Sequence, residues 1–462
     1  MSTAEAYDDL VVRGPLTPPR PAPPPSTLSG LRRLRAIREN GLASWDARAY
    51  EDDILCGRFL GRKSFTLNSP DAIRHVLIEN YENYTRTPPG LRVLRPILGR
   101  EGLLLAEGRD WKHQRRTLAP AFTPRAVETL VPHMMSAIGE TLNELETSAD
   151  RPVDLREAMQ RMTLAIAGRT MFSFSMAGDG ATLRGFVMEY AHRLAKPHLL
   201  DFLLPLSWPS PQDIARARFR KRWTAFVRKL IAERRTMMRP GEGARDMFEL
   251  MVAARDPETG ATFSDTQLAD QVATMILAGH ETTATALFWA LYLLSLDPGT
   301  QEMVAAEARA AGDLDASKLE ALRFTRAVLD ETMRLYPPAF LIARAAAGPD
   351  RIAGEDVTAG DVILISPWLL HRHTRLWHDP HAFMPGRFMP GAPQPNRFAY
   401  LPFGVGPRVC IGAHFALVEA TLALARFIER FHVSLVDRDP VMPVGVVTTQ
   451  PDRSPGFQLT RR

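Results

Sequence analysis

The sequence predicts a mainly α-helical protein with small β-sheets, folded as one large domain. The helical patterns are long, and the longest covers residues 264–296, whereas the strand patterns are short and few. The chain has no internal repeat and no long glycine- and serine-rich linker. We therefore expect a proline-rich lead-in over residues 1–30 and a single domain over residues 31–462.

The N-terminal part of the chain contains three predicted elements. A proline run from Pro15 to Pro25 favours an extended, polyproline-like segment. The basic segment from Leu31 to Arg38 is typical of an exposed helix face. Residues 64–67 carry the first strand pattern.

The pattern over residues 264–296 predicts one continuous helix. Ser264 and Gln267 can form a capping box at its start, because each side chain can bond the backbone N–H of the other residue. An Asp-Pro-Gly sequence at residues 297–299 ends the helix. At 1.5 Å per residue its length is about 50 Å. The second half is apolar nearly all round, so we expect it in the middle of the protein.

The C-terminal third of the chain adds two helices and two strands. One helix covers about Leu322 to Leu335 and ends before two prolines. The other begins just after Cys410 and continues to about Phe431. Residues 361–365 and the segment near residues 457–460 carry strand patterns.

Composition excludes several classes of protein. The net charge of +5 is small for 462 residues and does not indicate nucleic-acid binding. Two cysteines are too few for a secreted disulfide scaffold. The first ten residues lack the features of a signal peptide, and no run of about 18 apolar residues occurs. We therefore expect a soluble, cytoplasmic protein without a membrane anchor.

The strongest chemical signal is the segment 403–412, Phe-Gly-Val-Gly-Pro-Arg-Val-Cys-Ile-Gly. Its glycines and proline predict a constrained loop that presents Cys410 at the start of an apolar helix. Backbone N–H groups and the positive end of the helix stabilise a thiolate there. Arg408 is two residues away and can meet an anionic group on a flat ligand. For an isolated cysteine, a buried and unreactive thiol would be the alternative interpretation.

This segment resembles the haem-binding loop of the cytochrome P-450 family. The resemblance implies haem b, with the Cys410 thiolate as axial ligand of the iron and with Phe403 and Arg408 beside the porphyrin. It also implies the cytochrome P-450 fold, with the haem buried between the long central helix and the helix after the cysteine loop. A thiolate ligand increases electron density on iron and favours O–O cleavage.

Two more segments resemble structural motifs of this family. Glu331 and Arg334 lie three residues apart on one helix face, where an isolated pair would be interpreted as a surface ion pair. They resemble the family's glutamate–arginine helix motif, which supports the fold behind the haem. Residues 377–388 resemble the stretch whose arginine joins that pair, and Arg387 is the candidate for this structural role.

A polar cluster, Ala-Gly-His-Glu-Thr-Thr, interrupts the apolar central helix at residues 278–283. A broken local rule inside a buried element indicates function, although threonine hydroxyls bonded to the preceding turn would explain a non-functional kink. The cluster resembles the family's oxygen-activation motif. The resemblance implies that Glu281 and Thr282 deliver protons and that Ala278 lies beside the haem. We expect Gly279, which costs about 1 kcal/mol relative to alanine, to let the helix open locally.

Basic residues outside the cysteine loop complete the predicted haem contacts. Trp111 and Arg115 are four residues apart on one helix face and resemble the family's pair that contacts a haem propionate. Arg344 aligns with another position that often binds a propionate in this family.

A second stripe on the helix of Trp111 consists of Arg109, Lys112 and Arg116. We expect this stripe to face solvent on the thiolate side and to dock an acidic electron donor of the ferredoxin or flavodoxin type. A merely solvated basic face is the alternative. Only about fifty residues follow Cys410, which leaves no room for a fused reductase. Electrons from NAD(P)H would therefore arrive through a separate partner.

The resemblance implies an oxidoreductase, a haem-thiolate monooxygenase that inserts one oxygen atom of O2 into an apolar small molecule by hydroxylation or epoxidation. It places the substrate pocket between the loop 91–105, the helix face around Ala278, the turn 339–342 and the hairpin near residues 447–448. Residues 199–208 resemble the family's mobile lid, with a simple buried loop as the alternative. We expect the protein to be a monomer.

Two other functions remain possible at this stage. A haem-thiolate enzyme can use peroxide directly or isomerise an oxygenated substrate without outside electrons. The acid–threonine pair argues against this, because peroxide-using relatives often lack it. The second alternative is a haem-thiolate protein that binds or senses a ligand without turnover. Fatty acids, terpenoids, steroids and polyketides are all apolar enough to be substrates.

Overall fold

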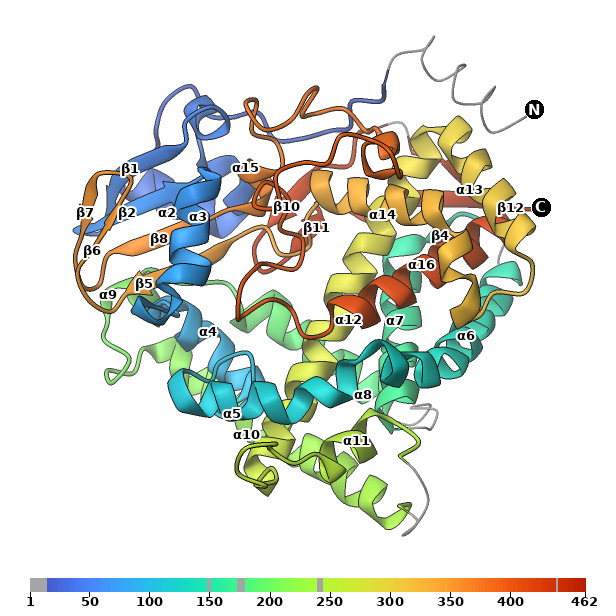
Figure 1. Cartoon of the computed structure of the whole chain (residues 1–462), viewed down its shortest axis with the longest axis horizontal. Helices are drawn as coiled ribbons and strands as arrows, with labels where there is room; N and C mark the ends of the chain where they lie inside the picture. Colours follow the sequence, from blue (N-terminus) through green and yellow to red (C-terminus); the bar gives the residue numbers. More distant parts are fainter. Residues whose placement is uncertain (1–14, 148–150, 173–178, 239–243, 438) are drawn as a thin grey trace.

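Helices form most of the molecule, and the largest sheet lies at one end of it (Figure 1). The structure is a computed structural model that describes residues 15–147, 151–172, 179–238, 244–437 and 439–462. The helices are α2 Gly30–Asn40, α3 Pro70–Arg74, α4 Pro88–Leu98, α5 Gly108–Leu118, α6 Pro124–Glu146, α7 Leu155–Phe172, α8 Gly180–Glu189, α9 Leu199–Leu203, α10 Pro211–Thr236, α11 Met247–Ala253, α12 Asp265–Leu296, α13 Pro298–Ala311, α14 Arg323–Leu335, α15 Pro367–Leu370 and α16 Ala413–Arg430. The strands are β1 Ile54–Phe59, β2 Arg62–Leu67, β3 Tyr84–Thr85, β4 Val153–Asp154, β5 Ile342–Ala346, β6 Asp350–Ile352, β7 Glu355–Val357, β8 Val362–Ile365, β9 Phe431–Leu435, β10 Pro443–Gly445, β11 Thr449–Pro451 and β12 Gly456–Arg461.

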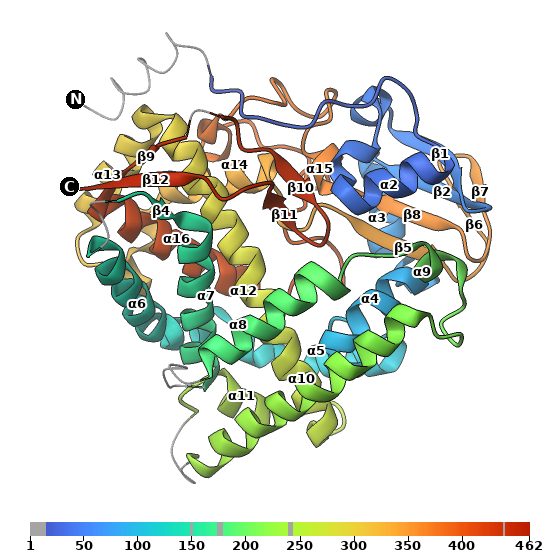
Figure 2. The same cartoon turned by 180° about the vertical axis from the view of Figure 1, so that it is seen from behind.

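Helix α12 is the central element, as the sequence predicts. The predicted capping box is present: the Gln267 N–H donates to Ser264 Oγ at 3.1 Å, and the Ser264 N–H donates to Gln267 Oε1 at 2.9 Å. Residues 283–294 are all buried. Helices α7, α14 and α16 pack around α12 (Figure 2). The apolar second half of α12 therefore forms the centre of the core.

The predicted strands belong to two different sheets. Residues 64–67 fall in β2 and residues 362–365 form β8, and these strands pair in parallel with Phe65 opposite Ile363. They belong to a five-stranded sheet of order β1-β2-β8-β5-β3. Residues 457–460 fall in β12, the middle strand of a three-stranded sheet of order β4-β12-β9. All three strand predictions are confirmed.

The described part of the proline-rich lead-in packs on the body of the protein. The Phe383 N–H donates to the Leu16 carbonyl at 2.7 Å, and the Tyr336 hydroxyl donates to the Pro19 carbonyl at 2.9 Å. Residues 15–24 are extended without regular structure, and α2 begins at Gly30. The division of the chain at residue 30 stays a prediction.

Two local expectations are wrong. The segment expected as a loop over residues 91–105 is helical up to Leu98, because α4 begins at two prolines and Thr87 Oγ1 caps it by accepting from the Gly90 N–H at 3.4 Å. Helix α12 also continues through Gly279 without a break.

None of the helices in the described ranges is long and apolar enough to cross a bilayer.

Candidate active site

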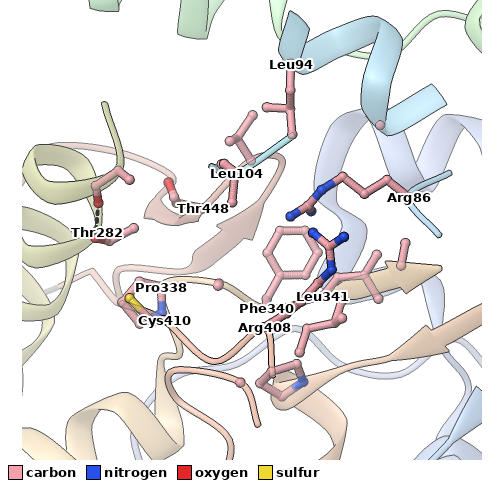
Figure 3. A pocket seen from close by; sticks show the side chains of 18 of the residues that line it. Arg86, Leu94, Leu104, Thr282, Pro338, Phe340, Leu341, Arg408, Cys410 and Thr448 are labelled. Atoms are coloured by element: carbon pink, nitrogen blue, oxygen red, sulfur yellow. Dashed lines mark hydrogen bonds between the residues drawn. The ribbon is translucent and has the colours of Figure 1, made fainter. Parts of the chain in front are cut away.

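A cavity of about 1170 Å³ lies between α12 and the cysteine loop (Figure 3). All the predicted pocket segments contribute to its wall, together with the segment before α10. Representative apolar residues are Val93, Leu94, Leu103, Ala278, Phe340, Leu341 and Val447. Because apolar side chains dominate the wall, the cavity suits an apolar ligand.

The cysteine loop is closed by its own backbone. The Cys410 N–H donates to the Phe403 carbonyl at 2.9 Å. Gly404 and Gly406 have φ angles of 71° and 78°, which favour glycine. A Cβ atom on Gly406 would lie 2.2 Å from the Leu77 carbonyl oxygen, so no larger residue fits there. This constrained loop presents the thiol of Cys410 to the cavity.

The surroundings of Cys410 have opposing effects on the pKa of its thiol. Burial raises the pKa of the Cys410 thiol above its ordinary value. The Gly412 backbone N–H and the Arg115 guanidinium oppose this by stabilising the thiolate. A cationic centre beside the sulfur would add to their effect. The loop therefore suits a thiolate that coordinates a metal in the cavity.

The predicted partners of the cysteine loop lie around it. The Arg408 guanidinium stacks on Trp111, 4.5 Å from the ring centroid, and donates to the Ala106 carbonyl at 3.0 Å. Arg115 Nη1 donates to the Val409 carbonyl at 2.8 Å. The structure thus brings Trp111, Arg115 and Arg408 together, as the sequence predicts.

Arg344 and Arg86 both line the cavity. The sequence did not indicate Arg86 as a site residue. Burial, reinforced by neighbouring arginines, lowers the pKa of Arg86 to about 9 and that of Arg344 to about 10. Glu107 is the carboxylate that faces this group: it bonds Arg408 and lies 3.8 Å from Arg86 Nε. The cluster therefore carries surplus positive charge, which suits an anionic ligand group.

These observations test whether the residues fit a haem. A thiol faces the cavity, half-buried arginines offer more positive charge than Glu107 can neutralise, and the remaining wall is apolar. A flat apolar ring that carries a metal ion and two carboxylates matches all three features. The site therefore fits haem.

Thr282 faces the cavity from α12 (Figure 3). Its hydroxyl donates to the Ala278 carbonyl at 2.6 Å. This bond satisfies the carbonyl within the helix, so Gly279 leaves no open turn, contrary to the sequence expectation. The Thr282 hydroxyl remains at the cavity wall, together with Ala278.

Glu281 is fixed by the C-terminal hairpin. Its Oε1 accepts from Thr448 Oγ1 at 2.9 Å and from Gln450 Nε2 at 3.2 Å. Gln450 Nε2 also donates to Thr285 Oγ1 at 2.9 Å. The sequence placed this hairpin at the pocket without predicting the bonds, which join residues more than 160 positions apart.

Glu419 on α16 is a buried carboxyl at the cavity that the sequence analysis did not single out. Burial raises its pKa well above the ordinary value, and Thr283 acts against this. His280 is buried as well, and burial lowers the pKa of its imidazole to about 4. Burial therefore disfavours the charged form of both groups.

The predicted structural motif is assembled outside the cavity wall. Arg334 donates to both carboxylate oxygens of Glu331, at 2.7 and 2.8 Å, and the pair is fully buried. Arg387 Nε lies 3.5 Å from Glu331 Oε1. Arg334 also donates to the His371 and Ala382 carbonyls at 2.8 and 2.7 Å. Such a satisfied buried pair costs about 3–5 kcal/mol to break from one side.

The basic stripe on α5 departs from the expectation. Lys112 pairs with Glu82 at 2.7 Å, and Arg116 pairs with the buried Asp256 at 3.0 Å. Arg109 is exposed. Carboxylates from distant segments therefore neutralise most of the stripe.

The segment expected as a lid consists of α9 and the turn after it. The Arg92 guanidinium donates to the Leu204 and Trp208 carbonyls, each at 3.2 Å, and pairs with Asp213 at 2.9 Å. Phe202 and residues 203–206 line the cavity. Its position at the cavity agrees with the expectation, and its movement stays a prediction.

Comparisons with known proteins agree with this geometry. The family model described as cytochrome P-450 matches residues 21–454. Cyclooctatin synthase of Streptomyces melanosporofaciens is 34% identical over 389 residues, covering 81% of this chain and 81% of the relative. Cyclooctat-9-en-7-ol 5-monooxygenase of the same organism is 28% identical over 438 residues, covering 91% and 93%.

A plant relative and a solved structure extend the comparison. The protein LUTEIN DEFICIENT 5, chloroplastic, of Arabidopsis thaliana is 30% identical over 416 residues, covering 84% of this chain and 68% of the relative. The crystal structure of the haem domain of cytochrome P-450DA superposes with a TM-score of 0.80 at 23% identity. It covers 97% of this chain and 98% of that one, so the two share a fold.

Proposed function

Because this chain belongs to the cytochrome P-450 family, we propose that it is a monooxygenase that inserts one oxygen atom of O2 into an apolar small molecule held in the cavity. Membership makes it a haem-thiolate oxidoreductase. The proposal adds the roles of individual residues, the substrate class and the source of electrons.

The arrangement of the cavity is the observation that carries the proposal. The Cys410 thiol faces it from the loop before α16, and the Thr282 hydroxyl faces it from α12. Apolar side chains fill most of the wall between them. A thiol, a hydroxyl and an apolar wall therefore meet in one space, which is what the proposed reaction requires.

Haem b held in this cavity would supply the activation of O2 and the transfer of oxygen to substrate. Cys410 would hold its iron, and Phe403 and Ala278 would lie against the ring. The propionates would be held by the basic cluster beside the cysteine loop, which consists of Arg86, Arg344 and Arg408 with Trp111 and Arg115. The apolar wall excludes water from the reacting groups.

Haem retention tests the cluster. We expect Arg344→Gln and Arg86→Gln each to increase the rate of haem loss roughly tenfold, since a hydrogen bond to a charged group contributes about 1.5–3 kcal/mol. Transfer of haem to excess apomyoglobin measures this rate. Arg351→Gln, an exposed arginine on β6, serves as the control and should leave the rate unchanged. Equal rates in all variants would contradict the assignment.

Glu281 and Thr282 would deliver protons to the reacting oxygen. Thr282 can rotate its hydroxyl from the Ala278 carbonyl toward the cavity and donate a proton there. Glu281 can take up a proton and pass it on, while Thr448 and Gln450 hold the position of its carboxylate.

The substrate would be an apolar molecule with few hydrogen-bonding groups. The apolar wall supports this. One relative is named as a monooxygenase of cyclooctat-9-en-7-ol, which is an alcohol. We propose a cyclic hydrocarbon or an alcohol derived from one. A shift of the haem Soret band on titration would identify compounds that enter the site.

Electrons would come from an acidic partner of the ferredoxin or flavodoxin type that docks near α5. Because Glu82 neutralises Lys112, we expect Glu82→Gln to speed reduction by the partner a few-fold, and Arg109→Glu with Lys112→Glu to slow it about tenfold. Both effects should shrink as the Debye length falls from about 10 Å at 0.1 M salt to about 3 Å at 1 M. Stopped-flow reduction measures the rates. Rates that do not respond to the variants or to salt would place the docking surface elsewhere.

Reconstitution tests the reaction itself. With NAD(P)H, a ferredoxin and its reductase, we expect substrate-dependent nucleotide consumption and one atom of labelled O2 in the product. Turnover with peroxide alone, without nucleotide, would indicate the peroxide-using alternative. Ligand binding without product would indicate a binding protein.

A further inference from the structure

The turn of the C-terminal hairpin carries both an apolar contact surface for the cavity and a hydrogen bond to Glu281. Residues 446–448 connect β10 to β11 and line the cavity. Val447 is 42% exposed, whereas Thr448 is 7% exposed. Thr448 Oγ1 donates to Glu281 Oε1 at 2.9 Å, and Thr282 and Thr448 both line the cavity (Figure 3). A molecule that packs against Val447 therefore presses on the residue next to the one that holds the acid.

The strands on either side of this turn are anchored to the body of the protein. On β10, the Gly445 N–H donates to Asn40 Oδ1 at 2.9 Å. On β11, Trp289 Nε1 donates to the Thr449 carbonyl at 2.7 Å, and the Thr449 N–H donates to the Pro338 carbonyl at 3.1 Å. Because the strands are fixed, pressure from the cavity displaces the turn and leaves the strands in place.

The bonds that hold Glu281 compete for donors. Gln450 Nε2 lies 2.8 Å from Thr448 Oγ1, 2.9 Å from Thr285 Oγ1 and 3.2 Å from Glu281 Oε1. An amide nitrogen has only two hydrogens for these three acceptors. The Thr285 hydroxyl is already a donor, since it bonds the Glu281 carbonyl at 2.8 Å. The contact with the carboxylate is the longest of the three, so it is lost most easily when the turn moves.

The held carboxylate is a poor carrier of protons. Hydrogen bonds from neutral donors stabilise the ionised form of an acid relative to the protonated form. Thr448 and Gln450 both donate to the same oxygen of Glu281. The acid must take up a proton before it can pass one to Thr282, so the hold keeps the relay idle.

We propose that the hairpin turn couples occupancy of the cavity to proton delivery: a bound molecule that displaces the turn releases Glu281 from Thr448 and Gln450. These two are positioning residues, because they act through the acid. The proposal rests on the proposed function, in which Glu281 and Thr282 deliver protons. When the cavity is empty, the held acid limits the waste reaction in which two electrons from NAD(P)H and two protons reduce O2 to hydrogen peroxide.

Peroxide formation without substrate tests the hold. The holoenzyme is supplied with NADPH, a ferredoxin and its reductase. We expect Gln450→Met and Thr448→Val, which keep side-chain size and remove the donors, each to raise peroxide formation about tenfold. The matched control is Gln301→Met. Gln301 is buried away from the cavity and donates to the Leu294 and Val433 carbonyls at 2.9 and 3.0 Å, so its variant should lose stability without extra peroxide.

A double variant separates positioning from packing. If Gln450 acts through the acid, then Gln450→Met added to Glu281→Gln should change peroxide formation by less than about twofold. A merely structural role would give the same change in both backgrounds. Equal changes in the two backgrounds, or wild-type peroxide formation in both Gln450→Met and Thr448→Val, would overturn the proposal.

Carbon-13 NMR of the holoenzyme labelled at the glutamate carboxyl carbons reports on the acid without turnover. The resonance of Glu281 is the one absent from Glu281→Gln. Two azoles that bind haem iron serve as probes, and the Soret band verifies that each is bound. Clotrimazole carries four aromatic rings beside its imidazole or on it and occupies much of the cavity, whereas imidazole alone is small. We expect clotrimazole to move the resonance toward its position in Gln450→Met, and imidazole to leave it near its position in the free protein.

The two readouts fail separately. Equal displacement of the resonance by both azoles, or displacement by neither, would overturn the coupling between the cavity and Glu281. If no form of the protein consumes electrons from the partner, the proposed function fails, and the resonance still decides whether occupancy of the cavity reaches the acid.

Discussion

Replacement of Cys410 by alanine is expected to abolish the red-shifted Soret band of the reduced, CO-bound protein and to reduce product formation to background. The band requires a thiolate on the iron. Only two cysteines occur in the chain, and Cys410 is the one whose thiol faces the cavity. The CO difference spectrum and the haem content, measured together, distinguish loss of ligation from loss of haem.

Two further variants make this result decisive. Cys56→Ser is the matched control, because Cys56 lies on β1 at the surface. It should keep the wild-type spectrum. Cys410→His offers an imidazole in place of the thiolate, so it should keep some haem but show the unshifted band. A Cys56 variant without the band, or a Cys410→His variant with it, would mean that another residue ligates the iron.

Replacement of Thr282 by alanine is expected to separate electron consumption from product formation. Haem content and substrate affinity should stay unchanged, because the side chain lies at the cavity wall and its hydroxyl donates to a carbonyl of its own helix. Without the hydroxyl, proton delivery is disordered, and much of the electron flow should end in hydrogen peroxide. We expect product per electron to fall about tenfold, which corresponds to about 1.4 kcal/mol.

The control for Thr282→Ala is Thr141→Ala. Thr141 Oγ1 makes the same kind of bond on α6, to the Ala137 carbonyl at 3.1 Å, but Thr141 does not line the cavity. Its variant can lose stability but should retain full coupling. Glu281→Gln should slow turnover more than it uncouples it, because the carbonyl oxygen can still accept from Thr448. Wild-type coupling in Thr282→Ala would show that the pair is structural.

Local patterns predicted the helices and the cysteine loop. The capping box at Ser264 and Gln267 depends on residues three positions apart, and each bond forms inside one turn. The cysteine loop is likewise contiguous, so its glycine angles and the bond from Cys410 to Phe403 follow from the segment itself. Glu331 and Arg334 lie on one helix face, which fixes their distance.

The predicted opening of the helix at Gly279 was wrong, because a neighbouring side chain bonds the carbonyl that would have been freed. Gly279 has a poor helix propensity, which predicts an opened turn. Thr282 instead bonds the carbonyl that would have been freed, and the surrounding helices hold α12 continuous. Propensity is the weaker effect here because packing fixes the buried helix.

The sequence alone determined the helical class and the constrained loop that carries Cys410, since both depend on neighbours along the chain. Tertiary structure alone decided the charges around them. Arg86 and Arg344 are 258 positions apart, and Glu107 comes from a third segment. Glu82, which comes from another segment, neutralises the charge of Lys112. Electrostatic pairing and burial act through space, so these features exist only after the chain has folded.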